Sequence, residues 1–298
     1  GEAIMDLWPV LRAPYSGRSK PGAMTGCWAL TAFPGWMCIL LLTVALLLTW
    51  RASSPLVRWL PRYAAYLKLE EQVMAATGPH LLFLNDDQRD QYLNHYPLPA
   101  SRYQVLPPGI EPDRRRPENY EELRNQVRRE LAVADNESLI LFLGSGFKVK
   151  GLDRVLAAFT KLPDSTKLMI VGNDDAEPYL SGVDETIRNR VVVLGPRDDV
   201  PALMQAADLL LHPAYRESAG MVLIEATVAG LPVLTTDTCG YARYVKEAGS
   251  GEVIPSPFSQ RDLNQTLQEM IGSVPGGWQA AGLEYGSSPA LYRLAQNV

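Results

Sequence analysis

A regular alternation of short apolar segments with helix-like segments, from Ser138 onward, constrains the fold of this chain more than any other feature. The segment at residues 139–143, Leu-Ile-Leu-Phe-Leu, is apolar without a break. Unbroken apolar strands that alternate with helices are typical of a parallel sheet covered by helices on both faces. We predict such strands at residues 139–143, 167–171, 191–194, 209–212, 232–235 and 252–254. The pattern therefore predicts an α/β fold with a doubly wound parallel sheet.

The chain divides into four parts. Residues 109–273 carry the alternating pattern and are predicted to be a Rossmann-like domain, followed by a C-terminal tail at 274–298. Residues 58–108 have a mixed pattern, with a predicted helix at 62–76 and a predicted strand at 80–85. A further helix is predicted at 119–131, near the start of the next part. The sequence Pro107-Pro108-Gly109, followed by Arg114-Arg115-Arg116-Pro117, is typical of a connection between domains.

The first part, residues 1–57, matches neither pattern. Its apolar run at residues 36–50 has fifteen residues, fewer than the roughly 20 that a bilayer-spanning helix needs. Three explanations stay open: a membrane-anchored variant, a truncated remnant, or an N-terminus translated in the wrong frame. The abrupt change from a low-charge segment to a well-patterned domain favours the third.

Charge and cysteine content exclude several classes of function. The net charge is −5 overall, and residues 131–298 carry 13 Lys+Arg against 20 Asp+Glu, so a nucleic-acid-binding face is not expected. The three cysteines, Cys27, Cys38 and Cys239, show no spacing of a zinc or redox site. A reducing, cytoplasmic setting and the absence of a metal site are the expectation.

The loop after the first strand of the large domain combines glycines and lysines. It runs Gly144-Ser145-Gly146-Phe147-Lys148-Val149-Lys150-Gly151, with a helix predicted to start near Leu152. Backbone N–H groups at a helix N-terminus, with a lysine beside them, suit a diphosphate. The Gly-Lys-Ser/Thr ending of a Walker A loop is missing. The alternative is a glycine-rich turn with solvated lysines.

A second loop carries two carboxylates, Glu217 in the loop itself and Glu225 within an apolar helix. Carboxylates accept hydrogen bonds from sugar hydroxyls, and the amides of residues 219–222 lie at a predicted helix N-terminus that favours phosphate. The structural alternatives are a charge at a helix start for Glu217 and an exposed helix face for Glu225. His212 either donates to a phosphate or sugar oxygen or is a structural histidine.

These loops carry a resemblance to a known family. The run from Gly195 to Val233 resembles the donor-binding half of the retaining family-four glycosyltransferases, which have the two-domain GT-B architecture. The motifs that carry it are Arg197-Asp198-Asp199-Val200, Ala207-Asp208-Leu209-Leu210-Leu211-His212-Pro213, Glu217, Gly220, Glu225-Ala226 and Gly230-Leu231-Pro232-Val233. Leu106-Pro107-Pro108-Gly109-Ile110, residues 144–154 and Thr235-Thr236-Asp237-Thr238-Cys239-Gly240-Tyr241 are similar to enzymes that add the first glucose to heptose in the lipopolysaccharide core.

The resemblance spans about residues 58–298 and implies a role for each matching residue. Lys150 and Glu217 would be catalytic, with Lys150 on the UDP diphosphate and Glu217 on the hexose, while Glu225 would hold the ribose hydroxyls. The remaining donor-binding residues implied are Gly144, Lys148, Arg197, Val200, Ser218, Ala219, Gly220, Met221 and Val222. Arg197 and Val200 would lie near the uracil, unless their segment is only a helix cap. The acceptor domain, of which 58–108 is the matching remnant, is expected to be incomplete or atypical.

The resemblance also implies an activity and its partners. The chain would be a retaining hexosyltransferase that moves glucose from UDP-glucose to a heptose of the lipopolysaccharide core, without a metal or other cofactor. It would work in the cytoplasm, peripherally at the inner face of the bacterial inner membrane, where the lipid-linked core oligosaccharide resides. Alternatives are a catalytically incomplete nucleotide-sugar-binding remnant, or the same fold with another hexose donor or glycan acceptor.

Overall fold

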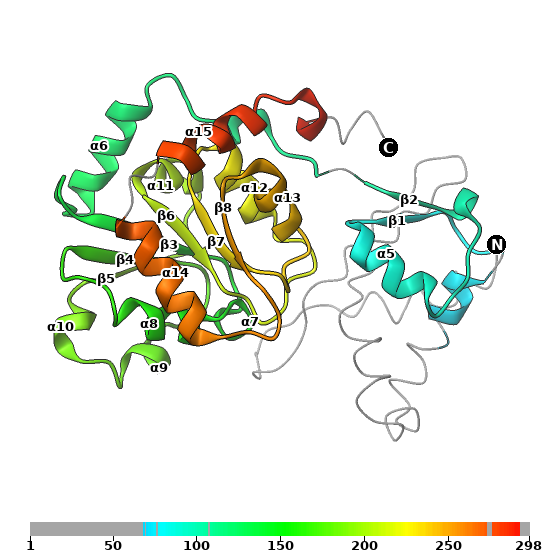
Figure 1. Ribbon diagram of the computed structural model, residues 1–298, viewed down its shortest axis with the longest axis horizontal. Coiled ribbons are helices and arrows are strands. Elements are labelled where there is room, and N and C mark those ends of the chain that lie inside the picture. The colour runs from blue at the N-terminus through cyan, green and yellow to red at the C-terminus, as the bar shows by residue number, and fades with distance from the viewer. Residues whose placement is uncertain (1–67, 69, 76, 107, 273–275, 293–298) are drawn as a thin grey trace, which may run out of the picture.

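The computed structural model describes residues 68, 70–75, 77–106, 108–272 and 276–292 (Figure 1). The first predicted part at 1–57, the apolar run at 36–50 and most of the helix predicted at 62–76 lie outside these residues. Within the described part of the chain, no helix has the length and apolar character that crossing a membrane requires.

A six-stranded parallel sheet forms the centre of the larger part. Its strands are β3 (Ser138–Leu143), β4 (Thr166–Val171), β5 (Val191–Gly195), β6 (Leu209–His212), β7 (Val233–Thr236) and β8 (Gly251–Ile254). All neighbouring strands pair in parallel, and their order is β5-β4-β3-β6-β7-β8. The predicted doubly wound parallel sheet is thus confirmed, with strand ends shifted by one residue at most.

Alternate residues of each strand enter two separate cores, one on each face of the sheet. Leu139 and Leu141 belong to one core and Ile140 and Phe142 to the other, and all four are fully buried. The first core is covered by α6 (Tyr120–Glu130), α11 (Val200–Ala206), α12 (Met221–Val228) and α13 (Ala242–Ala248). The second is covered by α8 (Leu152–Phe159), α9 (Glu177–Leu180), α10 (Glu185–Arg188) and α14 (Gln260–Gly272). Burial of both faces explains why the strands are apolar without interruption.

The segment after residue 275 packs onto the same domain. It forms α15 (Gly276–Tyr285) and the short η4 (Pro289–Tyr292), and α15 lies against α12 and α13. Leu291 is buried with Ile224 and Tyr241, and its carbonyl accepts a hydrogen bond from Ile110 N at 3.1 Å. The predicted tail at 274–298 therefore contributes to the packing of α12.

The smaller part, residues 68–106, has its own sheet and core beside the larger one (Figure 1). Strands β1 (Leu81–Phe83) and β2 (Tyr103–Val105) pair in parallel, with η2 (Ala100–Arg102) before β2. Helix α5 (Asp86–Leu93) follows β1, and Met74, Phe83 and Tyr92 form a small apolar cluster. The chain then reaches the large domain through η3 (Pro112–Arg114).

The strand order creates a topological switch point between β3 and β6. Successive strands run from β3 to β5 in one direction and from β6 to β8 in the other. In open parallel sheets of this type, ligands bind outside the carboxyl ends of the two strands at the switch point. The loops after β3 and β6 are the two that the sequence singles out for phosphate and sugar binding.

Candidate active site

The loops after β3 and β6 are held against each other by close backbone contacts. Gly151 has a left-handed conformation with φ of +80°, and a Cβ atom there would lie 2.3 Å from the carbonyl oxygen of Pro213. The backbone N–H of Tyr215 also donates to the carbonyl of Val149 at 2.8 Å. Glycine at position 151 is therefore required both by φ and by the approach of the two loops.

This approach brings Lys150 into an ion pair with Glu217. The pair joins Lys150 Nζ to Glu217 Oε2, and the two side chains are only 19% and 17% exposed. Burial lowers the pKa of Lys150, and the nearby Cys239 partly opposes this shift. A half-buried cation and anion thus meet at the switch point, at the carboxyl ends of β3 and β6.

His212 lies beneath this pair as a neutral imidazole. The side chain at the end of β6 is 1% exposed, and its Nε2 lies 3.9 Å from Glu217 Oε2. Burial, reinforced by the charge of Lys150, lowers the pKa of His212 to about 3. The imidazole therefore adds no positive charge near the carboxylate at neutral pH.

Arg154 stabilises the loop that precedes Glu217. Its guanidinium carbon lies 3.6 Å from the ring centroid of Tyr215 and 3.6 Å from that of Phe258. The same group donates to the carbonyl of Pro213 at 3.1 Å. Stacking on two rings restricts the guanidinium, so it can hold this loop with little further loss of side-chain entropy.

The start of α12 has no side-chain cap, and Glu225 lies one turn further along the helix. Gly220 occupies the N-cap position, so no side chain caps the first amides of α12. Glu225 is 21% exposed, and its Oε1 lies 3.6 Å from Nε of Arg114. Burial raises the pKa of Glu225, and Arg114 partly opposes the shift. Arg114 is thus the partner that a carboxylate in an apolar helix requires.

Comparison with known proteins identifies the family. The model of the family "Glycosyl transferases group 1" matches residues 124–273. The lipopolysaccharide glucosyltransferase WaaG of Escherichia coli (strain K12) is 39% identical over 251 residues, which cover 82% of this chain and 67% of that protein. The chain belongs to the group 1 glycosyltransferases.

Solved structures and further relatives agree with this assignment. A crystal structure of WaaG, a glycosyltransferase involved in lipopolysaccharide biosynthesis, matches with a TM-score of 0.76 at 38% identity and covers 84% of this chain and 70% of that one. A D-inositol 3-phosphate glycosyltransferase of Mycobacterium marinum is 29% identical over 71% of this chain and 46% of its own length. This group 1 glycosyltransferase therefore spans about two thirds of the first relative and about half of the second. The prediction of a GT-B type fold from the family resemblance is confirmed.

Not all predicted site residues of this group 1 glycosyltransferase lie together. The predicted loop at 144–151 contains one turn of helix, α7 (Phe147–Lys150), because Phe147 is buried against Phe142 and glycines flank the turn. The turn directs Lys150 inward, where its side chain packs beside Gly144, and leaves Lys148 exposed. Lys150 is therefore the lysine that the structure places at the switch point.

The segment at Arg197 and Val200 lies apart from the Lys150–Glu217 pair. It follows β5, the edge strand, and Val200 is the first residue of α11. Arg197 donates from Nε and Nη2 to the carboxylate of Asp199, at 2.7 and 2.6 Å. Asp199 stands at the N-cap of α11 without capping it through its side chain. The segment therefore does stand at the start of a helix, as the cap interpretation expects, although the Asp199 side chain makes no capping hydrogen bond. The role of the segment near uracil stays a prediction.

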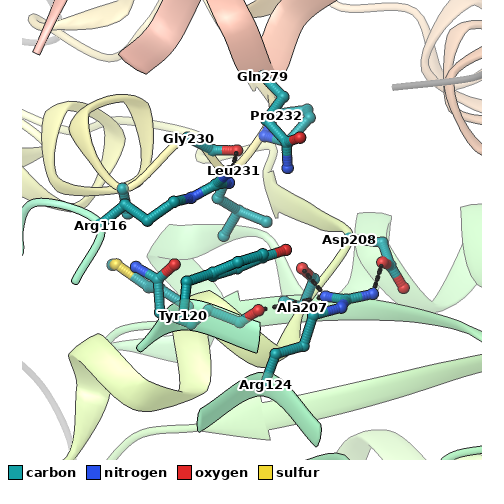
Figure 2. A pocket seen from close by; sticks show the side chains of 12 residues that line it. Arg116, Tyr120, Arg124, Ala207, Asp208, Gly230, Leu231, Pro232 and Gln279 are labelled. Atoms are coloured by element: carbon teal, nitrogen blue, oxygen red, sulfur yellow. Dashed lines mark hydrogen bonds and ion pairs between the residues drawn. The ribbon is translucent and has the colours of Figure 1, made fainter. Parts of the chain in front are cut away.

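A cavity of about 220 Å³ lies before the amino ends of β6 and β7 (Figure 2), whereas the switch-point site lies beyond the carboxyl ends of the strands. It is lined by residues before β6 and β7, including Asp208, Leu231 and Pro232, together with Arg116 and Arg124. Arg124 donates to the carbonyls of residues 205, 206 and 207 and to the carboxylate of Asp208. Arg124 thus holds α6 against the start of β6 through hydrogen bonds. Asp208, which accepts from Arg124, has a structural role. This cavity is not part of the switch-point site.

Two contributors to the site are not identified by the sequence analysis. The sequence assigned Arg114 only to an interdomain connection, whereas the structure pairs it with Glu225. A basic residue near the predicted domain boundary was a signal that it could pair with a carboxylate of the site. Asp174, in the loop after β4, accepts a hydrogen bond from the backbone N–H of Phe147 at 2.5 Å and holds the start of α7. A carboxylate shortly after a predicted strand could have indicated such a loop anchor.

Proposed function

We propose that the chain is a retaining glucosyltransferase that moves glucose from UDP-glucose to a heptose of the lipopolysaccharide core. The observation that carries the proposal is the Lys150–Glu217 pair at the switch point, next to the uncapped start of α12. A cation for a diphosphate, a carboxylate for sugar hydroxyls and helix amides without a side-chain cap for phosphate are thus brought together at one place. The name of the WaaG relative supports glucose as the transferred sugar.

The ion pair suggests how the donor would be engaged. In the ligand-free chain Glu217 neutralises Lys150, so the donor diphosphate must compete with a carboxylate for the lysine. Once the diphosphate holds Lys150, Glu217 is released to accept hydrogen bonds from hexose hydroxyls. Lys150 and the first amides of α12 would then stabilise the charge that develops on UDP as the bond to the anomeric carbon breaks.

The proposal needs no metal ion or other cofactor. The positive charge comes from Lys150 and from the N-terminus of α12, whose dipole favours the departing phosphate. Glu225 would accept the ribose hydroxyls, and Arg114 beside it would keep that carboxylate ionised. The acceptor oxygen would approach the face that UDP leaves, so that the transferred glucose retains its configuration.

The acceptor and the place of work belong to the same proposal. A lipid-linked core oligosaccharide lies at a membrane surface, so we infer that the chain acts in the cytoplasm, peripherally at the inner face of the inner membrane. The name of the WaaG relative supports this acceptor class. Basic and aromatic residues alternate at 58–68, a pattern typical of peripheral membrane segments and equally of an amphipathic helix packed on the core. These residues lie almost wholly outside the described part of the chain.

The proposal is tested by measuring UDP release from UDP-glucose by the purified chain, with and without heptose-terminated lipopolysaccharide core. Acceptor-dependent release is expected, together with the appearance of a glucosylated core in the mass spectrum. Binding of UDP without acceptor-dependent release would contradict the transferase proposal and leave a nucleotide-sugar-binding protein. UDP-galactose in a parallel reaction tests the choice of hexose.

Substitution of Glu225 by alanine should weaken the binding of UDP and of UDP-glucose by the same factor. A hydrogen-bonded carboxylate is worth roughly 1.5 to 3 kcal/mol, so a loss of about 10- to 100-fold in affinity is expected for both ligands. Isothermal titration of each ligand measures the effect. Unchanged affinity for UDP would show that Glu225 only packs against Arg114. Glu252→Ala, a substitution on the edge strand β8, is the control.

A further inference from the structure

Asn85 joins the smaller part of the chain to the loop that carries Glu217. It follows β1, is 2% exposed, and stands at the N-cap of α5. Its side-chain Oδ1 accepts from the backbone N–H of Gln88 at 2.7 Å, while its Nδ2 donates to the carbonyl of Ser218 at 2.8 Å. The oxygen of one side-chain amide thus caps its own helix, and the nitrogen of the same amide donates to a loop 133 residues away.

The bond to Ser218 completes a row of three anchored carbonyls. The carbonyl of Glu217 accepts from Gly240 N at 3.0 Å, and that of Ala219 accepts from Tyr241 N at 2.7 Å. These two partners belong to the large domain itself. The carbonyl between them, that of Ser218, receives its bond from Asn85 of the smaller part. The loop between Glu217 and α12 is therefore fully held only when residues 68–106 are docked.

The packing around this bond leaves little room for adjustment. A Cβ atom on Gly240 would lie 2.2 Å from the carbonyl oxygen of Ser218 and 2.3 Å from Nδ2 of Asn85. Next to it, Asp86 forms an ion pair with Arg243, whose Nη2 donates to Tyr244 Oη at 2.9 Å. The start of α5 is thus docked on the loop and on α13 by two adjacent contacts, one of them an uncharged, partly buried hydrogen bond.

We infer that Asn85 is a positioning residue of the transferase site: its Nδ2 holds the Ser218 carbonyl and so places Glu217 and the first amides of α12 for the donor. Asn85 touches neither the sugar nor the diphosphate and acts through the backbone of Ser218. The inference rests on the proposed function for its catalytic consequence. The placement of the loop itself is testable without any reaction.

Two substitutions separate this contact from the stability of α5. Aspartate and serine both cap helices about as well as asparagine, so Asn85→Asp and Asn85→Ser should preserve α5. Neither can donate to the Ser218 carbonyl, since an ionised aspartate has no donor and serine is too short. Asn94→Asp, at the exposed C-cap of the same helix, makes the same chemical change away from the interface.

The first measurement is amide hydrogen exchange of the ligand-free full chain. Loss of a hydrogen bond worth about 1 kcal/mol should speed exchange in peptides covering residues 214–222 by roughly 5- to 10-fold in both Asn85 variants, and less than about twofold in Asn94→Asp. Unchanged exchange in this loop for both variants would overturn the inference. Faster exchange throughout the chain, including β3 and β4, would also overturn it, because Asn85 would then serve only stability.

The second measurement compares the affinity for UDP with kcat for UDP release. UDP affinity should change less than about threefold in the Asn85 variants, because Lys150 and Glu225 remain, while kcat for UDP release falls by about tenfold. An unchanged kcat with faster loop exchange would contradict the catalytic part of the inference. Absence of UDP release by the unsubstituted chain would count against the proposed function alone, since the exchange result does not depend on it.

Discussion

Replacement of Lys150 by alanine is expected to lower kcat for UDP release by about 100- to 1000-fold, the range found when one donor to a developing negative charge is removed. Lys150 is the half-buried cation at the switch point, and its charge in the free chain is matched by Glu217. With the lysine gone, the departing diphosphate would lose a preorganised point charge, which solvent can replace only by reorganising. Steady-state UDP release, measured at saturating UDP-glucose, reports the effect.

Lys148→Ala is the matched control for this prediction. Lys148 lies on the same turn of helix, two residues earlier, but its side chain is exposed. Exposed charges contribute little, so kcat should change less than about threefold. A similar loss of activity in both variants would mean that the loop needs positive charge in general. Thermal unfolding of Lys150→Ala is needed as well, because the substitution leaves the carboxylate of Glu217 without its partner.

Glu217→Gln is expected to affect the binding of UDP and of UDP-glucose differently. The amide keeps the shape of the side chain but loses the charge, so hydrogen bonds to hexose hydroxyls weaken and kcat should fall by about 100-fold or more. UDP, which has no hexose, should bind at least as tightly as to the unsubstituted chain, because Lys150 no longer has a competing carboxylate. Titration with UDP and UDP-glucose, followed by kinetics, tests both statements.

The opposite pattern would reassign Glu217. If UDP binding weakened as much as UDP-glucose binding, the carboxylate would serve the nucleotide or hold Lys150 in place. Glu177→Gln is a suitable control, since Glu177 pairs with Arg188 on the surface of the same domain. That variant should leave both affinities and kcat within about twofold, as is usual for an exposed ion pair.

Much of the fold was predictable from local sequence. Six apolar segments separated by helices become six parallel strands, because a strand buried on both faces must be apolar along its whole length. The two loops that meet at the switch point were also predictable as the candidate site, since ligand sites in parallel sheets lie beyond the carboxyl ends of strands. Family membership followed from the motifs in those loops and is confirmed by the comparisons. The domain boundaries and the absence of a cofactor stay predictions.

The arrangement within the site was not predictable in the same way. Lys150 and Glu217 were assigned to separate parts of the donor, the diphosphate and the hexose, and their mutual ion pair follows from the approach of Gly151 to Pro213. Lys148 and Lys150 could not be distinguished until the turn at Phe147–Lys150 directed one outward and the other inward. Arg197, which the family resemblance places near the uracil, pairs with Asp199 beyond an edge strand, and its role in donor binding stays a prediction.

The sequence by itself determined the parallel sheet, the two loops and the family, because hydrophobic periodicity and motif spacing act over short stretches of chain. Only the tertiary structure decided which charges meet and which backbone groups are held. Asn85 shows the difference most clearly: locally it is a helix cap, and its second bond, to Ser218, exists because β1 and the loop after β6 are brought together in space. Hydrogen bonds and ion pairs between distant segments depend on ångström-scale packing, which no local pattern encodes.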